Sequence, residues 1–298
     1  MSDFIHHTRC PVCGSDAFND IITVKDYTVS GELFPIAECR SCSLRFTQDI
    51  PEPDKSIKYY KSENYISHSN TSKGLINQLY QKVRNRTMLK KRRMIEKLSG
   101  LQMGSLLDVG SGIGTFVSTM KEHGWDVTGI EPDESAREKA KEVYALELLD
   151  EESINDLPLN TFDVITLWHV LEHIYYLDDY LEKLRSLLKV NGKIFIAVPN
   201  YTSHDARVYN ECWAAYDVPR HLYHFSPRSM QALIDKMGLK IVACKPMWYD
   251  SFYISLLSSK YKNGKTRWIA ALWTGFRSNF SALFDTKKCS SVVYVVGK

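Results

Sequence analysis

Three glycines at alternate positions, Gly110, Gly112 and Gly114, follow a short apolar segment at residues 106–109. This pattern predicts a buried strand that ends in a tight turn and leads into a helix. Because glycine lacks a Cβ, the backbone of such a turn can touch a ligand, and the N–H groups of a helix start can bind a carboxylate or a phosphate. The turn is therefore the first candidate for a nucleotide-binding site.

Acidic residues follow at the ends of the next two expected strands. Glu131 ends the segment WDVTGI, 21 residues after Gly110. That distance is close to the offset of about 20 at which a carboxylate binds the hydroxyls of a nucleotide ribose. Asp150 and Glu151 follow a short segment at residues 146–149, where a carboxylate could accept a hydrogen bond from an adenine amino group.

Four cysteines form two close pairs, Cys10 with Cys13 and Cys39 with Cys42, and 25 residues separate the pairs. Two C-x2-C pairs are typical of a tetrahedral zinc site, and four thiolates leave no open coordination position. We therefore expect a structural zinc ribbon, with reduced structural cysteines as the alternative. The ion would contribute on the order of 10–16 kcal/mol to a module too small to form its own core.

Histidines that could act as a general base occur in two places. His169 and His173, with Glu172 beside them, follow an expected strand at residues 162–168, and His221 and His224 lie further along the chain. Proton abstraction from a hydroxyl is the chemistry that these side chains would support. For Glu172 and His173, ordinary packing at the start of a helix is the alternative.

The second pair of histidines lies in the segment CWAAYDVPRHLYHFSPR, residues 212–228. Long segments without regular structure in compact domains are usually functional or disordered, and this one is too aromatic to be disordered. We expect it to close over a substrate, with His221 as the base; packing of Trp213 and Phe225 alone is the alternative. The expected substrate contacts are Tyr216, Arg220, Tyr223 and His224.

The elements expected to position these residues alternate between strands and helices. Helix 115–123, strand 125–130, helix 133–144, strand 146–149, strand 162–168, helix 177–189 and strand 193–198 follow the glycine turn. This alternation predicts an α/β fold with a doubly wound, mostly parallel sheet, and ligands at the carboxyl ends of its strands. Helix 227–237, a strand at 239–244 and a helical insertion at 250–285 precede the last strand, residues 291–296, which we expect to form a hairpin at one sheet edge.

Two further helices have distinctive surfaces. Helix 75–98 carries eight basic residues and one acidic residue between Lys82 and Lys97, which indicates a solvated face or a face that binds nucleic acid. Helix 267–284 is aromatic and amphipathic. It could cover the active site, mediate dimerisation or rest on a membrane surface.

The composition sets broad limits on location and partners. The formal charge of +3 neither requires nor excludes a polyanionic partner. The first residues, MSDFIHHTRC, contain no apolar run, and no stretch approaches the roughly 20 apolar residues that span a bilayer. We therefore expect a cytoplasmic protein without a transmembrane segment, in which seven cysteines serve metal binding rather than a disulfide framework.

Several of these motifs together resemble the class I S-adenosylmethionine-dependent methyltransferases. LLDVGSGIG resembles their first motif, GIEPDESA their acidic turn, FDVITLWHVLEHI their fourth strand and LLKVNGKIFIAVPN their fifth. The resemblance implies a seven-stranded, Rossmann-like sheet, with S-adenosylmethionine as cofactor and Trp168 and His169 beside its methyl group. It implies a set of cofactor-binding residues, namely Asp108, Gly110, Ser111, Gly112, Gly114, Glu131, Pro132, Asp150, Glu151, Trp168 and His169.

The resemblance extends beyond the cofactor domain. The cysteine pairs and the tyrosines after them resemble bacterial methyltransferases of sugar and polysaccharide biosynthesis, which carry an N-terminal zinc ribbon. The tail is shorter than in the sugar C-methyltransferase branch. Glu172 and His173 resemble part of the metal-assisted site of ubiquinone-pathway O-methyltransferases, although His169 stands where those enzymes have a further carboxylate.

The expected organisation is a zinc ribbon at residues 1–50, a linker at 51–72 and a methyltransferase domain at 73–298. The expected reaction is methyl transfer to a small-molecule acceptor, such as a sugar or glycan intermediate, by a monomer or homodimer. An RNA methyltransferase that holds RNA with the zinc ribbon and the basic helix 82–97 is the alternative. A third hypothesis is a non-enzymatic zinc-ribbon adaptor with a degenerate cofactor domain. The intact glycines and Glu131 argue against this hypothesis.

Overall fold

The structure is a computed structural model that describes residues 3–60 and 75–298, without the side chains of residues 75–85. The last part of the expected linker, at 61–72, lies outside the described residues. The chain forms two compact units. Unit 1 comprises Met1–His68, Leu171–Asp178 and Ala197–Tyr294, and unit 2 comprises Ser69–Val170, Asp179–Ile196 and Val295–Lys298. Both units therefore contain separate stretches of the sequence.

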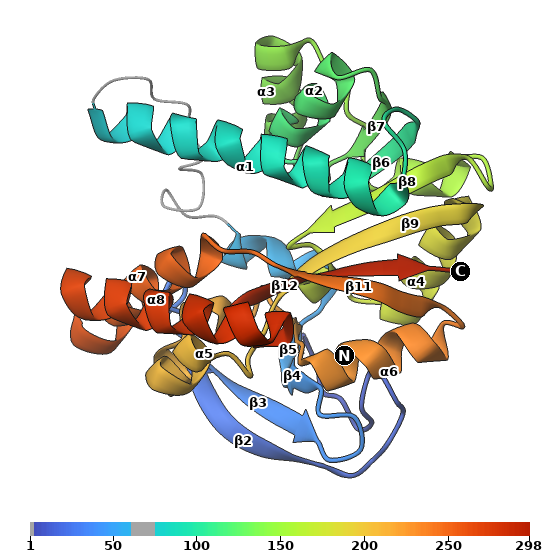
Figure 1. Cartoon of the computed structure of the whole chain (residues 1–298). Coiled ribbons are helices and arrows are strands. Elements are labelled where there is room, and N and C mark those ends of the chain that lie inside the picture. Colours follow the sequence, from blue (N-terminus) through green and yellow to red (C-terminus); the bar gives the residue numbers. More distant parts are fainter. Residues whose placement is uncertain (1–2, 61–74) are drawn as a thin grey trace. The chain divides into compact units, whose positions relative to one another are not determined.

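Unit 2 contains the expected alternation of strands and helices (Figure 1). Strand β6 (Ser105–Val109) pairs in parallel with β7 (Asp126–Ile130) and with β8 (Phe162–Trp168). Its helices are α1 (Leu75–Ser99), α2 (Thr115–Glu122) and α3 (Glu134–Tyr144), and the short 3-10 helix η2 (Glu152–Asp156) precedes β8. The apolar residues that predicted β6 and β8 are wholly buried, among them Leu106, Leu107 and Ile165.

The central sheet has six strands in the order β11-β12-β9-β8-β6-β7 within the described residues. Here β9 is Leu188–Pro199, β11 is Lys240–Pro246 and β12 is Ser291–Gly297. The expected seventh strand at 146–149 is reduced to a single parallel bridge between Ile130 and Leu149. The last strand takes a place beside β11, near one edge of the sheet, as the sequence predicts.

Unit 1 contains a second, antiparallel sheet in the order β10-β4-β3-β2. It is formed by β2 (Phe18–Lys25), β3 (Leu33–Cys39), β4 (Arg45–Thr47) and β10 (Tyr223–His224). A two-stranded sheet pairs β1 (Phe4–Ile5) with β5 (Ile50–Pro51), and the 3-10 helix η1 (Pro53–Tyr59) follows. Residues near the N-terminus and the 212–228 segment therefore share one sheet, because β10 pairs with β4.

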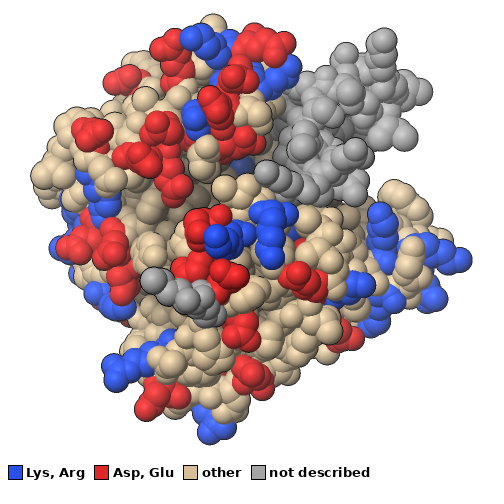
Figure 2. All heavy atoms as spheres, turned by 180° about the vertical axis from the view of Figure 1, so that it is seen from behind, with Lys and Arg blue, Asp and Glu red and all other residues tan. Residues whose placement is uncertain are grey.

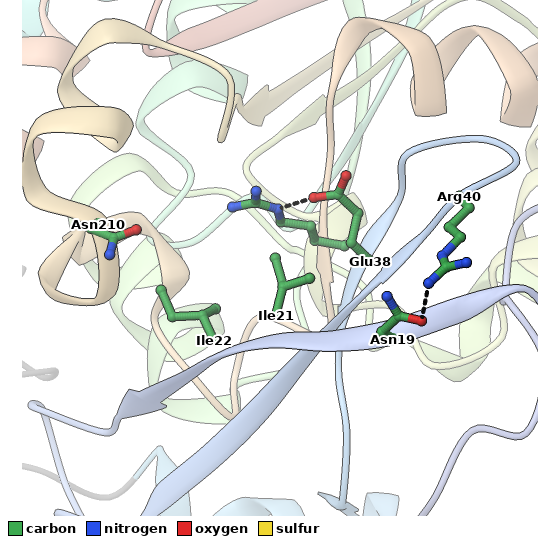
Figure 3. Close-up of a pocket in the computed structure, with 7 residues that line it drawn as sticks. Asn19, Ile21, Ile22, Glu38, Arg40 and Asn210 are labelled. Carbon is green, nitrogen blue, oxygen red and sulfur yellow. Dashed lines mark hydrogen bonds and ion pairs between the residues drawn. The ribbon is translucent and has the colours of Figure 1, made fainter.

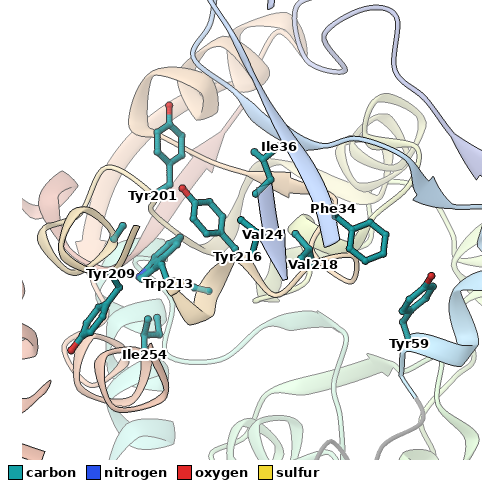
Figure 4. Packing of buried hydrophobic residues seen from close by; sticks show 12 residues of the cluster. Val24, Phe34, Ile36, Tyr59, Tyr201, Tyr209, Trp213, Tyr216, Val218 and Ile254 are labelled. Atoms are coloured by element: carbon teal, nitrogen blue, oxygen red, sulfur yellow. The ribbon is translucent and has the colours of Figure 1, made fainter. Parts of the chain in front are cut away.

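The core of unit 1 joins β2 and β3 to the aromatic residues of the 212–228 segment (Figure 4). Trp213 and Tyr216 pack edge to face in this core and are each 1% exposed. The segment itself contains two 3-10 turns, η4 (Asn210–Cys212) and η5 (Ala214–Tyr216), before β10. The packing of Trp213, which the sequence offered as the alternative reading of this segment, is thus present in the structure.

Helices complete the two units. Helix α5 (His204–Tyr209), α6 (Pro227–Lys236), α7 (Asp250–Asn263) and α8 (Trp268–Phe284) belong to unit 1, together with η3 (Leu171–His173) and η6 (Thr286–Lys288). Helix α4 spans Leu177–Leu187. The predicted start of α6 is confirmed, because Ser226 caps it and Pro227 is its first residue. Among the described residues, no helix combines the length and apolar character needed to cross a membrane.

Candidate functional site

The glycine turn after β6 is held against the end of β7 by backbone hydrogen bonds. The N–H groups of Gly110 and Ser111 both donate to the carbonyl of Ile130, at 2.8 and 2.9 Å. Gly110 and Gly112 have φ angles of +69° and +53°, a region that glycine adopts at little cost. A Cβ on Gly110 would lie 2.4 Å from Val170 Cγ2, whereas a Cβ on Gly112 would meet nothing within 4 Å. The backbone at Gly112 therefore borders open space.

Glu131 connects this turn to the end of β7. Its carboxylate accepts the N–H of Gly112 at 2.7 Å and the N–H of Asp133 at 3.0 Å. The side chain is buried, and burial raises the pKa of its carboxyl above the usual value. Each carboxylate oxygen has a second lone pair. Glu131 can therefore hold the turn and still accept hydrogen bonds from the hydroxyls of a ligand.

Asp108 and Trp168 lie at the ends of β6 and β8 in unit 2. Asp108 is fully buried, which raises its pKa to about 6, and it accepts a hydrogen bond from the Thr166 hydroxyl. The Trp168 ring packs edge to face on Phe116, and the Lys91 ammonium lies 4.1 Å from its centre. The indole N–H of Trp168 is buried and has no hydrogen-bond partner in the described part of the chain. This N–H is therefore a hydrogen-bond donor that a bound molecule could use.

The residues after the 146–149 segment are exposed. Asp150 accepts hydrogen bonds from the N–H and the hydroxyl of Ser153, which lower its pKa. Glu151 is exposed next to it. Pro132 accepts a hydrogen bond from Arg137 through its carbonyl. Asp150 is thus engaged as a cap for the turn that follows, while partial burial of the Glu151 carboxyl raises its pKa.

Unit 1 brings together Glu172 and His173 with His221, which lies 49 and 48 residues further along the chain. One ligand-type atom from each side chain lies within 4.8 Å of the others. The two rings meet edge to face with centres 4.7 Å apart. Burial is the main cause that lowers the pKa of His173 to about 4, and the neighbouring His221 contributes further. The His173 ring is therefore uncharged at neutral pH.

Backbone carbonyls define the tautomers of the two histidines. His173 Nδ1 lies 3.0 Å from the carbonyl of Arg220, and His221 Nδ1 lies 2.9 Å from the carbonyl of Ala215. A carbonyl only accepts, so each Nδ1 carries the proton and each Nε2 keeps its lone pair. The Tyr60 hydroxyl also approaches His173 Nδ1, at 3.3 Å. Two basic nitrogens and a carboxylate are therefore held together in unit 1.

The other candidates from the 212–228 segment lie inside unit 1. Arg220 forms ion pairs with Asp26 at 2.9 Å and Asp217 at 2.6 Å, and it donates to the carbonyl of Tyr59. Its side chain is fully buried. The hydroxyl of Tyr216 accepts a hydrogen bond from Arg45 at 2.6 Å. These contacts hold the backbone on the N-terminal side of His221.

Tyr223 and His224 form the short strand β10. The Tyr223 hydroxyl donates to the carbonyl of Tyr175, and His224 Nε2 lies 3.1 Å from the Thr47 hydroxyl. His224 is buried and its pKa is well below the usual value because of that burial. His169, which follows β8 in unit 2, has a φ of +59°, an unusual conformation for a histidine. Such conformations cluster at functional sites.

The four cysteines of the two C-x2-C pairs form one cluster. All four Sγ atoms lie within 4.8 Å of one another, with Cys10 to Cys42 and Cys13 to Cys39 at 3.5 Å. Zinc bound at about 2.3 Å places tetrahedral sulfurs about 3.8 Å apart. Each pair sits in a similar turn, since Gly14 N–H donates to the Cys10 carbonyl and Ser43 N–H to the Cys39 carbonyl. Donor set and spacing match a tetrahedral S4 site.

A pocket on the antiparallel sheet of unit 1 is lined by Asn19, Ile21, Ile22, Glu38, Arg40, Arg45 and Asn210 (Figure 3). Its charged groups are already paired. Arg45 donates to Glu38 at 2.7 Å and stacks on the Tyr201 ring, and Arg40 donates to Asn19. The pocket contains no histidine or glycine turn and is separate from the candidate residues above.

Residues 74–244 match a protein family described as a methyltransferase domain, over more than half of the chain. The chain belongs to this family. The match includes the glycine turn, Glu131 and the cluster of Glu172, His173 and His221, and it confirms the predicted enzyme class, an S-adenosylmethionine-dependent methyltransferase. The cysteine cluster and helices α7 and α8 lie outside the matched residues.

Relatives and solved structures agree with this methyltransferase assignment. The ubiquinone biosynthesis O-methyltransferase of Histophilus somni is 34% identical over 120 residues, which cover 36% of this chain and 50% of that protein. The enzyme of the same name from Vibrio parahaemolyticus is 29% identical and is matched over 77% of its length and 58% of this chain. For most of the curated relatives, the match spans about half of their length.

The fold is shared with a SAM-dependent methyltransferase from Archaeoglobus fulgidus. That structure superposes with a TM-score of 0.50 and 18% identity, over 76% of this chain and all of that chain. The six-stranded sheet of this methyltransferase is therefore Rossmann-like.

Sequence reasoning missed the partners that hold the cluster of the methyltransferase in place. Asp217 lies three residues before Arg220, and this spacing could have indicated a local ion pair. Asp26 lies 194 residues away from Arg220, and no local pattern in the sequence connects them. The Tyr60 hydroxyl contacts His173, 113 residues away, and no local pattern indicates this contact either.

Proposed function

We propose that this methyltransferase transfers a methyl group from S-adenosylmethionine to a hydroxyl oxygen of a small molecule. The observation that carries the proposal is the cluster of Glu172, His173 and His221, in which one nitrogen of each histidine and a carboxylate oxygen lie within 4.8 Å of one another and each Nδ1 lies against a backbone carbonyl. Hydroxyl acceptors need a base because the neutral oxygen is a weak nucleophile, and a positioned base contributes about 10²–10⁴-fold.

The residues of unit 2 have the chemistry that the methyl donor requires. The open side of Gly112 admits a close approach, Glu131 offers acceptors for ribose hydroxyls, and the Trp168 indole supplies an unpartnered buried donor. Glu151 or Asp150 would contact the adenine, and Ser111, Gly114, Pro132 and His169 complete the proposed set. When bound, the donor supplies a methyl group already activated by its sulfonium.

The protein then has to orient the acceptor and remove its proton. Alignment of two reactants contributes roughly 7–11 kcal/mol to lowering a barrier. We assign His221 as the base, with its Nδ1–H donated to the Ala215 carbonyl and its Nε2 lone pair accepting the proton. The Glu172 carboxylate stabilises the imidazolium that forms, and His173 is uncharged and therefore does not repel it. Glu172 follows Trp168, the last residue of β8, by four residues.

The same three side chains also have the chemistry of a divalent-cation site. Metal-bound histidines commonly donate their second N–H to a backbone carbonyl, as both histidines do here. The relatives named for ubiquinone biosynthesis point to O-methylation, and the cysteine pairs resemble those of sugar methyltransferases. We propose that the acceptor is a hydroxyl on a sugar or on a phenol. Tyr223 or His224 would contact this substrate next to the base. Arg220 and Tyr216 position His221.

The four-cysteine cluster is proposed to bind one structural zinc ion. All four Sγ atoms would be ligands, so no position remains for substrate or water. The proximity of the thiols supports the assignment: the hydrogen bond between Cys10 and Cys42 lowers the pKa of the Cys10 thiol and raises that of Cys42, and a bound cation would favour the thiolate form of both. The zinc would hold β2, β3 and β4, and through β10 the segment that carries His221.

The experiment measures formation of S-adenosylhomocysteine with pools of sugar nucleotides and of hydroxylated aromatics. We expect one pool to give turnover, and His221→Ala to lower kcat by at least about 100-fold with little change in donor affinity. The matched control is His123→Ala, at the exposed position that directly follows α2. A chelator followed by added Mg²⁺ distinguishes a cation site from a metal-free base. Turnover unaffected by His221→Ala would refute the assignment of the base.

The RNA alternative gains no support from helix α1. Arg92 is paired with Glu96, and Lys91 lies over the rings of Trp168 and Phe116. Part of the basic face predicted from the sequence is therefore engaged within unit 2.

A further inference from the structure

Helix α8 packs on unit 1 through its smallest side chains. Ala271, Gly275, Ser278 and Ala282 are buried, and α8 lies alongside α7 (Figure 1). A Cβ on Gly275 would lie 2.8 Å from the Phe252 ring and 3.1 Å from a backbone oxygen of α7. Small residues thus bring the two helices close together. The largest apolar side chains of α8 take no part in this packing.

Those large side chains point away from the protein instead. Eight of them are between 45% and 87% exposed: Trp268, Ile269, Leu272, Trp273, Phe276, Phe280, Leu283 and Phe284. Four aromatic rings follow one another along the helix, with centres 5.7, 6.4 and 5.2 Å apart from Trp273 to Phe284. Contiguous exposed apolar surface of this kind marks an interaction site. We call these eight residues the α8 face.

Basic residues flank the α8 face at both ends. Residues 260–288 contain seven Lys or Arg and one acidic residue, Asp285. Lys260, Lys262, Lys265 and Arg267 precede the helix, Arg277 lies within it, and Lys287 and Lys288 follow it. Lys and Arg side chains gather at the right-hand edge in Figure 2, where the rotated view places α7 and α8. The partner of this face should therefore be apolar and negatively charged at its rim.

We infer that the α8 face binds the surface of an anionic lipid bilayer. An aromatic helix flanked by Lys and Arg lies in the plane of the headgroups and buries its apolar face. Trp268 and Trp273 are of the residue type that prefers this interface. A symmetric dimer through the same face would bring the basic residues of the two copies together, which opposes a second copy of the chain as occupant. At 17 residues, α8 is too short to span a bilayer.

The test measures binding of the full chain to vesicles of phosphatidylcholine, alone and with 30 mol% phosphatidylglycerol, by flotation and by tryptophan fluorescence. We expect binding to the anionic vesicles and at least tenfold weaker binding for Phe276→Ser/Phe280→Ser, since exposing one buried aromatic side chain costs about tenfold or more. Lys287→Gln/Lys288→Gln should weaken binding to anionic vesicles by about fivefold per charge. Both changes are at exposed positions and should leave the melting temperature unchanged.

The matched control is Leu159→Ser/Val190→Ser, at apolar positions that are equally exposed outside α8. It should bind vesicles like the unsubstituted chain. The inference is overturned by absence of binding at 1 mM anionic lipid, or by equal binding of the control and the Phe276→Ser/Phe280→Ser variant. It is also overturned if that variant turns a dimer into a monomer, by analytical ultracentrifugation, while the vesicles capture neither form.

Discussion

Replacement of Glu131 by glutamine tests the proposed donor site most directly. The carboxylate accepts backbone N–H groups from Gly112 and Asp133, and in the proposed complex it also accepts two ribose hydroxyls. A hydrogen bond to a charged acceptor contributes about 1.5–3 kcal/mol, and one to a neutral acceptor about 0.5–1.5 kcal/mol. Two such losses amount to about 2–3 kcal/mol, or a Kd for S-adenosylmethionine that is roughly 30- to 150-fold higher.

The stability of the protein should change much less than its affinity. The amide presents an N–H₂ group where one backbone N–H needs an acceptor, which costs about 1–3 kcal/mol. However, the substitution also removes a buried carboxyl whose pKa is raised by burial, and this offsets part of the loss. Isothermal titration with S-adenosylmethionine measures the affinity, and urea denaturation measures the free energy of unfolding.

The control for this prediction is Glu147→Gln, because the Glu147 side chain is 82% exposed. It should bind the donor like the unsubstituted protein. A Kd for Glu131→Gln within threefold of the unsubstituted value, in a folded protein, would refute the assignment of the ribose site.

Four further predictions concern the glycine turn, a buried acid, the ion pairs and the cysteines. Gly110→Ala should lower the free energy of unfolding by about 2–5 kcal/mol, because the strain of a positive φ and the overpacking against Val170 both contribute. Gly112→Ala should lower it by only about 1–2 kcal/mol but should weaken donor binding. Urea denaturation measures the first quantity and calorimetric titration the second. Burial raises the pKa of Asp108 to about 6. The protonated carboxyl therefore contributes fully to the free energy of unfolding below about pH 4, and about 3 kcal/mol of this contribution is lost as the pH rises from there through 6. Asp108→Asn should remove this part of the pH profile. Arg220→Met should cost about 3–5 kcal/mol, because it leaves two carboxylates without a counter-charge. Cys39→Ser should abolish bound zinc, measured by plasma mass spectrometry of the purified protein.

Each of these predictions has an outcome that contradicts it. Equal stability of Gly110→Ala and Gly112→Ala would mean that the Val170 side chain can move away from the added methyl group without loss of stability. If the free energy of unfolding of Asp108→Asn depends on pH as in the unsubstituted protein, groups other than Asp108 cause the dependence at acid pH. Cys244→Ser serves as the control for Cys39→Ser, since Cys244 lies outside the four-cysteine cluster, and loss of zinc in both variants would argue against the proposed ligands.

Local patterns in the sequence were sufficient for most elements of unit 2. The apolar runs and glycine turns predicted β6, β7, β8 and the helices between them to within one or two residues, because a buried parallel strand and its crossover helix each have a characteristic period. The segment at 146–149 was the exception. Its pairing depends on how β7 and the chain after α3 meet, and only one bridge forms.

What the sequence determined by itself was the chemistry available: the spacing of the glycines, the acid after the second strand, the paired cysteines and the histidines. What only the tertiary structure decided was which of these side chains meet. His221 reaches Glu172 and His173, whereas Tyr216 and Arg220, from the same segment, turn into the core. The physical reason is that Arg220 pairs with Asp26, which directly follows β2 and lies 194 residues away in the sequence. A buried charge requires a counter-charge, and no local period in the sequence encodes a pair so far apart.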